Sequence, residues 1–216
     1  MRNNIFKIFL FISFYIFTVN ANSVEEFNFD ITEINITENG DKFTGDQRGT
    51  ISSNNGIIID ADKFEYYKKK NILKASGNVK IIDKINNYEI YTQDITYEKN
   101  NNLILTKDGS RAIDKTGEIE IVADIFEYNL SKNIVVAKGK AELLNKTQDY
   151  QIFSDFISYS KNIGKITSQG KTSAVVHSKY LFDSSNVKFL INEMELSSND
   201  NTTIKDNLNL YNLKKF

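Results

Sequence analysis

The chain has 216 residues, with no cysteine, proline or tryptophan and with one histidine. The absence of cysteine excludes disulfides, thiol nucleophiles and cysteine-ligated metal sites, and one imidazole cannot form a multi-histidine site. Lys and Arg number 27 against 28 Asp and Glu, so no basic excess favours nucleic acid, while 40% hydrophobic residues exclude a disordered chain.

Residues 1–21 have the pattern of a secretory signal peptide. The apolar run 8–17 follows Arg2 and Lys7, and Ala21 supplies the small residue of a cleavage site. The run is shorter than the ~20 apolar residues that span a bilayer, which argues against a retained membrane anchor. We therefore expect cleavage after Ala21 and export to the periplasm.

A repeat of 31 residues runs along the remaining segment, 22–216, which we expect to form one domain. Its clearest marker is a tyrosine that recurs at intervals of 31 residues, at Tyr66, Tyr97, Tyr128 and Tyr159. A glycine follows each tyrosine by eleven or twelve residues, at Gly77, Gly109, Gly139 and Gly170. A fixed period of this length indicates units that stack and share one core.

Apolar residues recur in four columns within the repeat. Two columns are the tyrosines and the residues two positions before them, Phe64, Ile95, Phe126 and Ile157. The other two lie four residues before and after each glycine, at Leu73, Leu105, Val135 and Ile166 and at Ile81, Ile113, Leu143 and Ala174. Residues two apart share one face of a strand, so this alternation predicts an all-β fold of about six units, each with two strands of about ten residues.

One phrase of the repeat also resembles a known family. The sequence A-D-x-F-E-Y at 61–66, the aliphatic Leu73 and S-G-N-V-K-I at 76–81 resemble the repeat of the OstA-like (organic solvent tolerance-like) domain of lipopolysaccharide-transport proteins. The resemblance covers residues 27 to about 210, although G-N-V becomes G-K-A at 139–141. It implies a repetitive antiparallel β-jellyroll, or β-taco, whose walls form an open apolar groove for lipid A acyl chains.

The resemblance and the columns together predict the residues that line this groove. We expect them to be Phe64, Tyr66, Leu73, Ile95, Tyr97, Leu105, Phe126, Tyr128, Val135, Ile157, Tyr159 and Ile166. Alternation alone does not decide whether the interior is held open for a ligand or closed by its own packing.

The implied function is that of a conduit that binds lipopolysaccharide on its way to the outer membrane, with no catalytic residue, metal or cofactor. Expected partners are other OstA-like domains docked edge to edge, and a lipoprotein or an outer-membrane β-barrel continuation. The stretch 206–216 resumes the repeat and stops, so we expect a domain truncated at its C-terminal end. This favours the N-terminal part of an LptD-like protein over an LptA-like bridge. An exported structural β-solenoid without a lipid ligand is the alternative from another class.

Three groups of polar residues have weaker functional interpretations. His177, Ser178 and Asp183 lack the surrounding pattern of a nucleophile and its oxyanion hole, so we expect no hydrolase. The column Asp62, Asp124 and Asp155 is better explained by turn chemistry than by calcium, because it offers one carboxylate per unit. The basic segment 68–70 is expected to be a solvated turn, with a phosphate-binding rim as the alternative.

Overall fold

We describe a computed structural model of the chain, covering residues 27–116, 118–206 and 208–213. The predicted signal peptide, 1–21, lies outside these residues. In the described ranges, no helix has the length and apolar character needed to cross a membrane.

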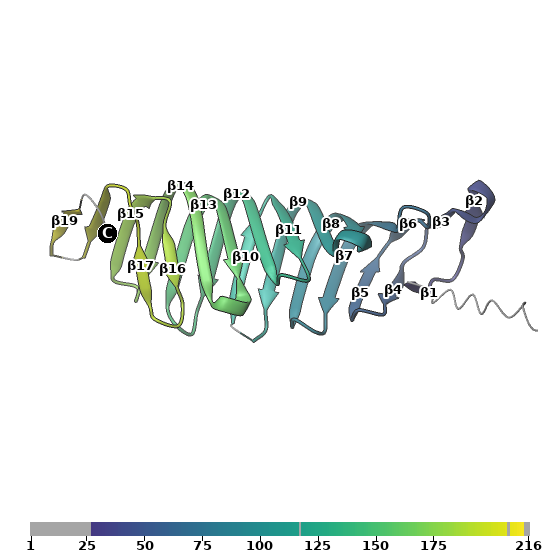
Figure 1. The fold of residues 1–216 in the computed structure, drawn as a ribbon, viewed down its shortest axis with the longest axis horizontal. Helices are drawn as coiled ribbons and strands as arrows, with labels where there is room; N and C mark the ends of the chain where they lie inside the picture. Colours follow the sequence, from purple (N-terminus) through teal and green to yellow (C-terminus); the bar gives the residue numbers. More distant parts are fainter. Residues whose placement is uncertain (1–26, 117, 207, 214–216) are drawn as a thin grey trace, which may run out of the picture.

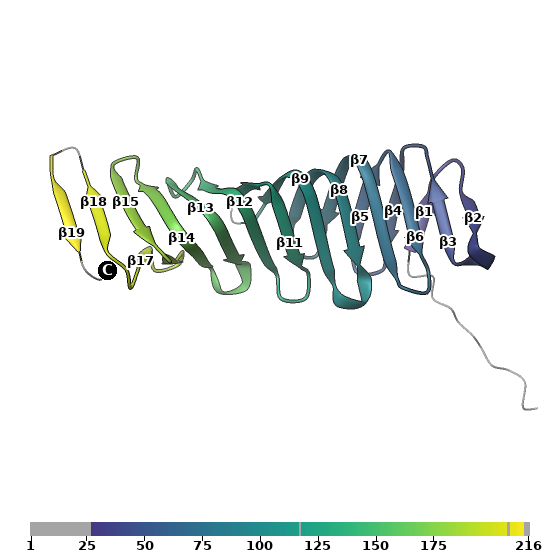
Figure 2. The same cartoon turned by 90° about the horizontal axis from the view of Figure 1, so that it is seen from above.

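The fold is a single antiparallel sheet of 19 strands that doubles back on itself. The strands run across the long axis of the molecule and follow one another along it in chain order, from the purple end to the yellow end (Figures 1 and 2). This arrangement confirms the predicted all-β class and the stacking of successive repeats. The only helical segments described are three single 3-10 turns, η1 (Glu38–Gly40), η2 (Lys99–Asn101) and η3 (Lys161–Ile163).

The central strands are long and bent, so that each one belongs to both walls of the folded sheet. They are β7 (Ile72–Asp83), β8 (Tyr88–Glu98), β9 (Leu103–Asp114), β12 (Ile134–Asn145), β13 (Tyr150–Ser160) and β14 (Lys165–Val176). Elsewhere a similar path is divided into two shorter strands: β3 (Lys42–Gly45) and β4 (Gly49–Ser53), β5 (Ile57–Ala61) and β6 (Lys63–Tyr67), β10 (Ile119–Ala123) and β11 (Ile125–Asn129), β15 (Tyr180–Ser185) and β16 (Lys188–Leu190), and β17 (Glu195–Ser197) and β18 (Thr202–Lys205). The remaining strands are β1 (Phe27–Asp30), β2 (Asn35–Thr37) and β19 (Leu210–Leu213).

We call the two halves of the folded sheet the first wall and the second wall, and the line along which they meet the crease. The first wall contains β2, β3, β6, β11, β16 and β17, with the adjoining halves of the long strands. The second wall contains β1, β4, β5, β10, β15, β18 and β19, with the other halves. Opposite the crease lies the mouth, where the hairpin turns of the two walls face each other.

The recurring glycines form the crease, where the long strands bulge. In β7, Gly77 and Asn78 both have positive φ angles, 77° and 46°, and the pairing with β8 shifts register between Ser76 and Val79. A β-carbon on Gly77 would also lie 2.7 Å from a carboxylate oxygen of Asp62. Gly77 is therefore required by both the backbone conformation and the space available.

Each wall contributes an unbroken row of apolar side chains to the interior. In the first wall, aromatic and aliphatic residues alternate from strand to strand, and the row reads Ile36, Phe43, Tyr66, Leu73, Tyr97, Ile104, Tyr128, Val135, Tyr159, Ile166, Phe189 and Leu196. The second wall's row reads Ile51, Ile59, Ile81, Ile90, Ala112, Ile121, Leu143, Ile152, Ala174, Phe182 and Ile204. The two rows face each other and make one core, which neither wall could bury alone.

The sequence-based register is wrong in one unit. Leu105 lies on the outer face of β9 and is half-buried, whereas Ile104 is fully buried in the interior row. Likewise Ala112, and not Ile113, points inward. The bulge keeps the 31-residue period, with Asp108 in the slot of Gly77 and Gly139, but here the glycine is the second residue of the bulge, with a φ angle of 80°. Counting from Gly109 therefore shifted the predicted face by one residue.

This register can be tested with two neighbouring alanine substitutions. Ile104→Ala should lower the free energy of unfolding by ~2–4 kcal/mol, because it leaves a cavity in the closed interior. Leu105→Ala should lower it by ~1 kcal/mol or less, because that side chain is on the outer face. Urea denaturation of the two variants measures the difference, and equal losses would contradict the register.

Candidate functional site

The structure brings the predicted groove residues together between the walls, with one exception. Phe64, Tyr66, Ile95 and Tyr159 are at most 7% exposed, and Leu73, Tyr97, Phe126, Tyr128, Val135, Ile157 and Ile166 are at most 1% exposed. Leu105 is the exception, since it faces outward. The predicted interior is thus one continuous surface, and Ile104 takes the place assigned to Leu105.

The space between the walls is filled by their own side chains. Tyr88 of the second wall meets Tyr128 of the first edge to face, with ring centroids 5.1 Å apart, and Tyr150 meets Phe189 in the same way at 4.8 Å. Large aromatic residues of one wall lie against the aliphatic row of the other, a pattern that fills a core at high density. The question left open by the sequence, open groove or packed interior, is answered as packed in this structure.

The mouth is closed by side chains that reach from one wall to the other. The Tyr128 hydroxyl donates to Asp83 Oδ2 at 2.6 Å, and the Tyr159 hydroxyl donates to Asp114 Oδ2 at 2.9 Å. At the preceding position, Asn55 Nδ2 donates to the Tyr97 hydroxyl at 2.7 Å. We call these three cross-wall pairs the seam. In the described part of the chain, backbone hydrogen bonds join the walls along the crease, whereas side chains make the links across the mouth.

The seam carboxylates also organise the turns in which they lie. Asp83 Oδ1 accepts hydrogen bonds from the backbone N–H groups of Ile85 and Asn86, each at 2.9 Å. Asp114 Oδ1 accepts from the N–H of Thr116 at 2.9 Å in the same manner. Each carboxylate therefore fixes a hairpin turn with one oxygen and holds the opposite wall with the other.

A buried ion pair reinforces the seam at Asp114. Lys161, from the 3-10 turn η3 of the first wall, places Nζ 2.6 Å from Asp114 Oδ1, and the Asp114 side chain is fully buried. Lys161 Nζ also donates to the backbone carbonyl of Asn86 at 2.5 Å. Because Asp114 keeps four polar contacts, its charge is compensated although water is excluded.

Burial at the seam raises the pKa of the tyrosines well above the usual value of about 10. For Tyr128, burial is the main cause and the hydrogen bond to Asp83 adds to it, so the pKa of the phenol rises. Burial, followed by the charge of Asp114, raises the pKa of Tyr159 in the same way. Burial also raises the pKa of Tyr150 to about 12. These phenols therefore remain protonated donors throughout the physiological range.

Small residues line the interior at the crease, where the walls are closest. Ala61, Ala75 and Val79 occupy these positions in one unit, and the hydroxyl residues Thr92, Thr106 and Ser110 occupy them in the next. In the second set, Thr106 Oγ1 accepts a hydrogen bond from the N–H of Phe126 at 2.8 Å. These hydroxyls satisfy backbone groups that the break between β10 and β11 frees.

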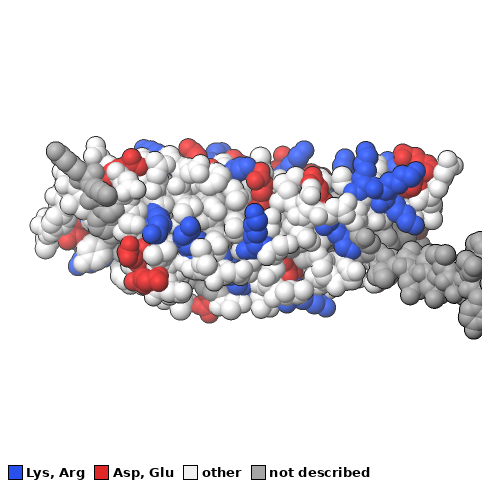
Figure 3. Space-filling model, viewed as in Figure 1, with Lys and Arg blue, Asp and Glu red and all other residues white. Residues whose placement is uncertain are grey.

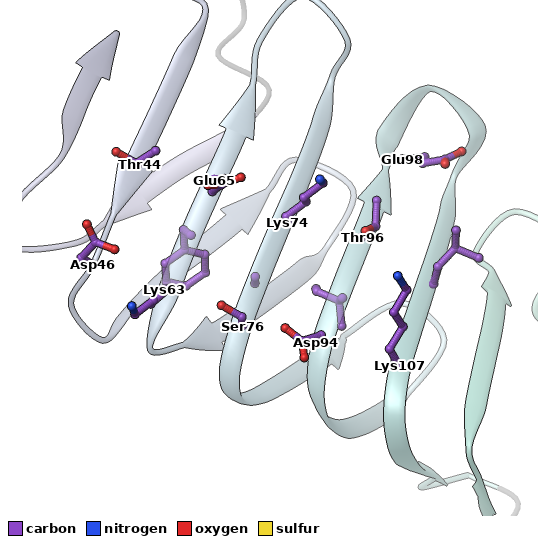
Figure 4. Close-up of a pocket in the computed structure, with 14 residues that line it drawn as sticks. Thr44, Asp46, Lys63, Glu65, Lys74, Ser76, Asp94, Thr96, Glu98 and Lys107 are labelled. Atoms are coloured by element: carbon purple, nitrogen blue, oxygen red, sulfur yellow. The ribbon is translucent and has the colours of Figure 1, made fainter.

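The outer face of the first wall carries a polar concavity of about 770 Å³. Its rim alternates in charge, with Lys63, Lys74 and Lys107 beside Glu65 and Asp94 on neighbouring strands (Figure 4). Such a surface is expected for a solvated sheet face, and we assign it no function.

Basic side chains gather over β3, β6 and β7 near the N-terminal end (Figure 3). Lys42, Lys70 and Lys74 place their Nζ atoms within 6.0 Å of the centre of the Tyr67 ring. The Tyr67 hydroxyl donates to Glu65 at 2.8 Å, and this bond is the main reason why the pKa of Glu65 is lowered. The predicted turn 68–70 belongs to this cluster, and one of its lysines, Lys69, forms an ion pair with Asp41.

The candidate catalytic residues are not arranged for catalysis. His177 and Ser178 lie in the turn after β14 with positive φ angles, and the Ser178 hydroxyl donates to Asp149 at 2.8 Å. Asp62 accepts from Arg48 and Asn78 at the crease, in line with the predicted turn chemistry. Across the described residues, no three His, Cys, Asp or Glu side chains are grouped as metal ligands.

Sequence reasoning missed the seam and the crease hydroxyls. Asp83, Asp114 and Asn145 recur at 31-residue intervals, and this spacing was a signal that could have revealed a shared structural role. What the spacing could not supply is the identity of the partners, because Tyr128 and Asp83 are 45 residues apart and lie in different walls.

The seam can be tested by removing one hydroxyl. Tyr128→Phe should lower the free energy of unfolding by ~1.5–3 kcal/mol, because the buried Asp83 carboxylate loses a donor. Tyr91→Phe is the matched control, since the Tyr91 hydroxyl makes the same type of bond to Glu89, at 2.7 Å, on the half-exposed outer face. That variant should lose less than ~1 kcal/mol. Equal losses in urea denaturation would show that the seam adds nothing to an ordinary tyrosine–carboxylate contact.

The tyrosine pKa values also predict a loss of stability at alkaline pH. With a folded pKa above the unfolded value of 10.0, the folded protein retains protons that the unfolded chain releases. The stabilisation is fully present below pH ~10 and falls by ~1.4 kcal/mol per pH unit for each such tyrosine above it. Denaturation between pH 8 and 11 measures this slope. Tyr128→Phe should make it shallower, whereas substitution of the exposed Tyr211 by Phe should leave it unchanged.

No protein-family model matches this chain, and no curated protein matches it. Among solved structures it is similar to LptH, described as the LptA homologous periplasmic component of the conserved lipopolysaccharide transport device from Pseudomonas aeruginosa. The match has a TM-score of 0.46 and 16% sequence identity, and it covers 52% of this chain and 81% of that one. A similarity at this level does not assign a function, so the function is argued below from this chain alone.

Proposed function

We propose that the chain is a non-enzymatic lipid conduit that holds the acyl chains of lipopolysaccharide between its two walls. The observation that carries the proposal is the pair of facing apolar rows, which continue from strand to strand through the stack. A row of this kind offers an acyl chain nearly the same surroundings at every repeat. Cargo could therefore slide along it without meeting a deep energy minimum.

The way in which the walls are joined supports the same proposal. Backbone ladders hold the crease, but the mouth depends on a few side-chain pairs such as Asp83–Tyr128 and Asp114–Tyr159. Each bond of this type contributes ~1–3 kcal/mol. Each acyl methylene that leaves water contributes ~0.8 kcal/mol, so a few methylenes offset the loss of one pair. An acyl chain that enters replaces contacts between the walls with contacts of the same apolar kind.

Location and partners follow from the sequence resemblance. The predicted signal peptide, 1–21, is consistent with action in the periplasm on the route to the outer membrane. In the described part of the chain, β19 pairs with β18 on one side, and we propose that its other edge docks a further OstA-like domain by strand addition. We further propose that the domain is the N-terminal part of an LptD-like protein, with an LptA-like bridge as the alternative.

The packed interior favours a second candidate, an exported structural β-solenoid that binds no lipid. The fully buried Tyr97, Tyr128 and Phe126 already complete a core without any ligand. The two candidates differ in whether purified protein takes up lipopolysaccharide between its walls.

Photocrosslinking from two phenylalanine positions separates these candidates. Phe126 points into the interior and is fully buried, whereas Phe153 points outward and is 37% exposed. With benzoylphenylalanine at position 126, the protein should crosslink to purified lipopolysaccharide, because that side chain would contact acyl chains. The same residue at position 153 is the control and should give little product. Absence of crosslinking from position 126, in protein whose circular dichroism is unchanged, would favour the structural solenoid.

A further inference from the structure

The seam is interrupted at one position in the C-terminal half. Phe189 continues the row of Tyr97, Tyr128 and Tyr159, since it pairs with Ile166 just as Tyr159 does. Phenylalanine has no hydroxyl, so it cannot make the bond that those tyrosines make across the mouth. The facing position in the second wall also changes, because Asn145 stands 31 residues after Asp114, where the earlier units have aspartate.

A cavity of about 430 Å³ opens in the mouth beside this interruption. Turns of both walls line it, with Asn145 and Gln148 from the second wall and Ile191 and Asn192 from the first. One end of the cavity is bounded by the closed pair Asp114–Tyr159. The cavity therefore lies between the last closed pair of the seam and the position where the next pair is missing.

The lining of the cavity has an apolar side and a polar rim. Ile119, Tyr159 and Ile191 supply apolar surface, and Ile119 and Tyr159 also belong to the buried core, so this surface is continuous with the interior. The rim is rich in amide and hydroxyl groups, from Thr116, Asn145, Thr147, Gln148 and Asn192. Its lysine, Lys161, is already paired with Asp114. Neutral donors and acceptors of this kind suit a hydroxyl-rich headgroup better than a bare phosphate.

We propose that this gap in the seam is the entry site through which an acyl chain of a glycolipid passes into the interior. The proposal rests on the proposed conduit function and adds the place of entry and the headgroup class. Behind the cavity, the walls meet through the edge-to-face contact between Tyr150 and Phe189. Separating two aromatic rings exposes apolar surface that an acyl chain can cover, whereas separating Tyr159 from Asp114 would leave a buried carboxylate short of a donor. Entry is therefore easiest here.

Cysteine protection tests the entry site directly, because the chain contains no cysteine of its own. In Ile191→Cys, dodecyl maltoside below its micelle concentration should slow modification by N-ethylmaleimide several-fold. Ile85→Cys is the matched control, since Ile85 is an exposed mouth residue beside the closed pair Asp83–Tyr128. Its modification rate should not change. Dodecyl phosphate has the same chain with an anionic headgroup and should protect position 191 less.

A second variant closes the gap. Phe189→Tyr combined with Asn145→Asp rebuilds the missing pair and should abolish the protection at position 191. If circular dichroism shows that this variant is unfolded, Tyr159→Phe replaces it. By removing the neighbouring pair, Tyr159→Phe should widen the gap and increase protection.

The proposal is overturned if dodecyl maltoside fails to protect position 191, protects positions 191 and 85 equally, or still protects position 191 after the gap is closed. Equal protection by dodecyl phosphate overturns the headgroup class. Failure here is distinguishable from failure of the conduit. Crosslinking of lipopolysaccharide from position 126 without protection at position 191 would remove the entry site and leave the conduit intact.

Discussion

The architecture depends on the need of each wall to bury an apolar face that it cannot bury by itself. A two-stranded unit of this repeat leaves one side of its Leu, Ile and Tyr residues exposed, and only a facing wall can cover it. The bend at each crease bulge, as at Gly77 and Asn78, lets one strand contribute to both walls. The interior width, the tyrosine row and the placement of the seam all follow from this folding of one sheet onto itself.

The sequence predicted the strands and most of the interior because both depend on local alternation. Val135 and Tyr159, for example, are neighbours in the first wall, as their columns implied. The prediction for Leu105 was wrong because it was counted from a glycine, whereas the invariant of the fold is the 31-residue position of the bulge, which Asp108 occupies in that unit. A bulge needs residues that tolerate positive φ, and aspartate satisfies this requirement as well as glycine does in some units.

The seam could not be predicted in the same way, since it depends on the distance between two walls. Asp83 looks like an ordinary turn residue, and its local bonds to the N–H groups of Ile85 and Asn86 agree with that interpretation. Its second role appears only when folding brings Tyr128 to the opposite side of the mouth. Whether the interior is packed or open was undetermined for a related reason, because alternation identifies an inward face but not the space in front of it.

The constant period of the crease has one more consequence. Since every repeat bends at an equivalent point and rests only on its neighbours, removing or duplicating one whole repeat should leave the junctions on either side compatible. The molecule is in this sense a ruler graduated in repeats, whose reach can change in whole steps without any redesign of its cross-section.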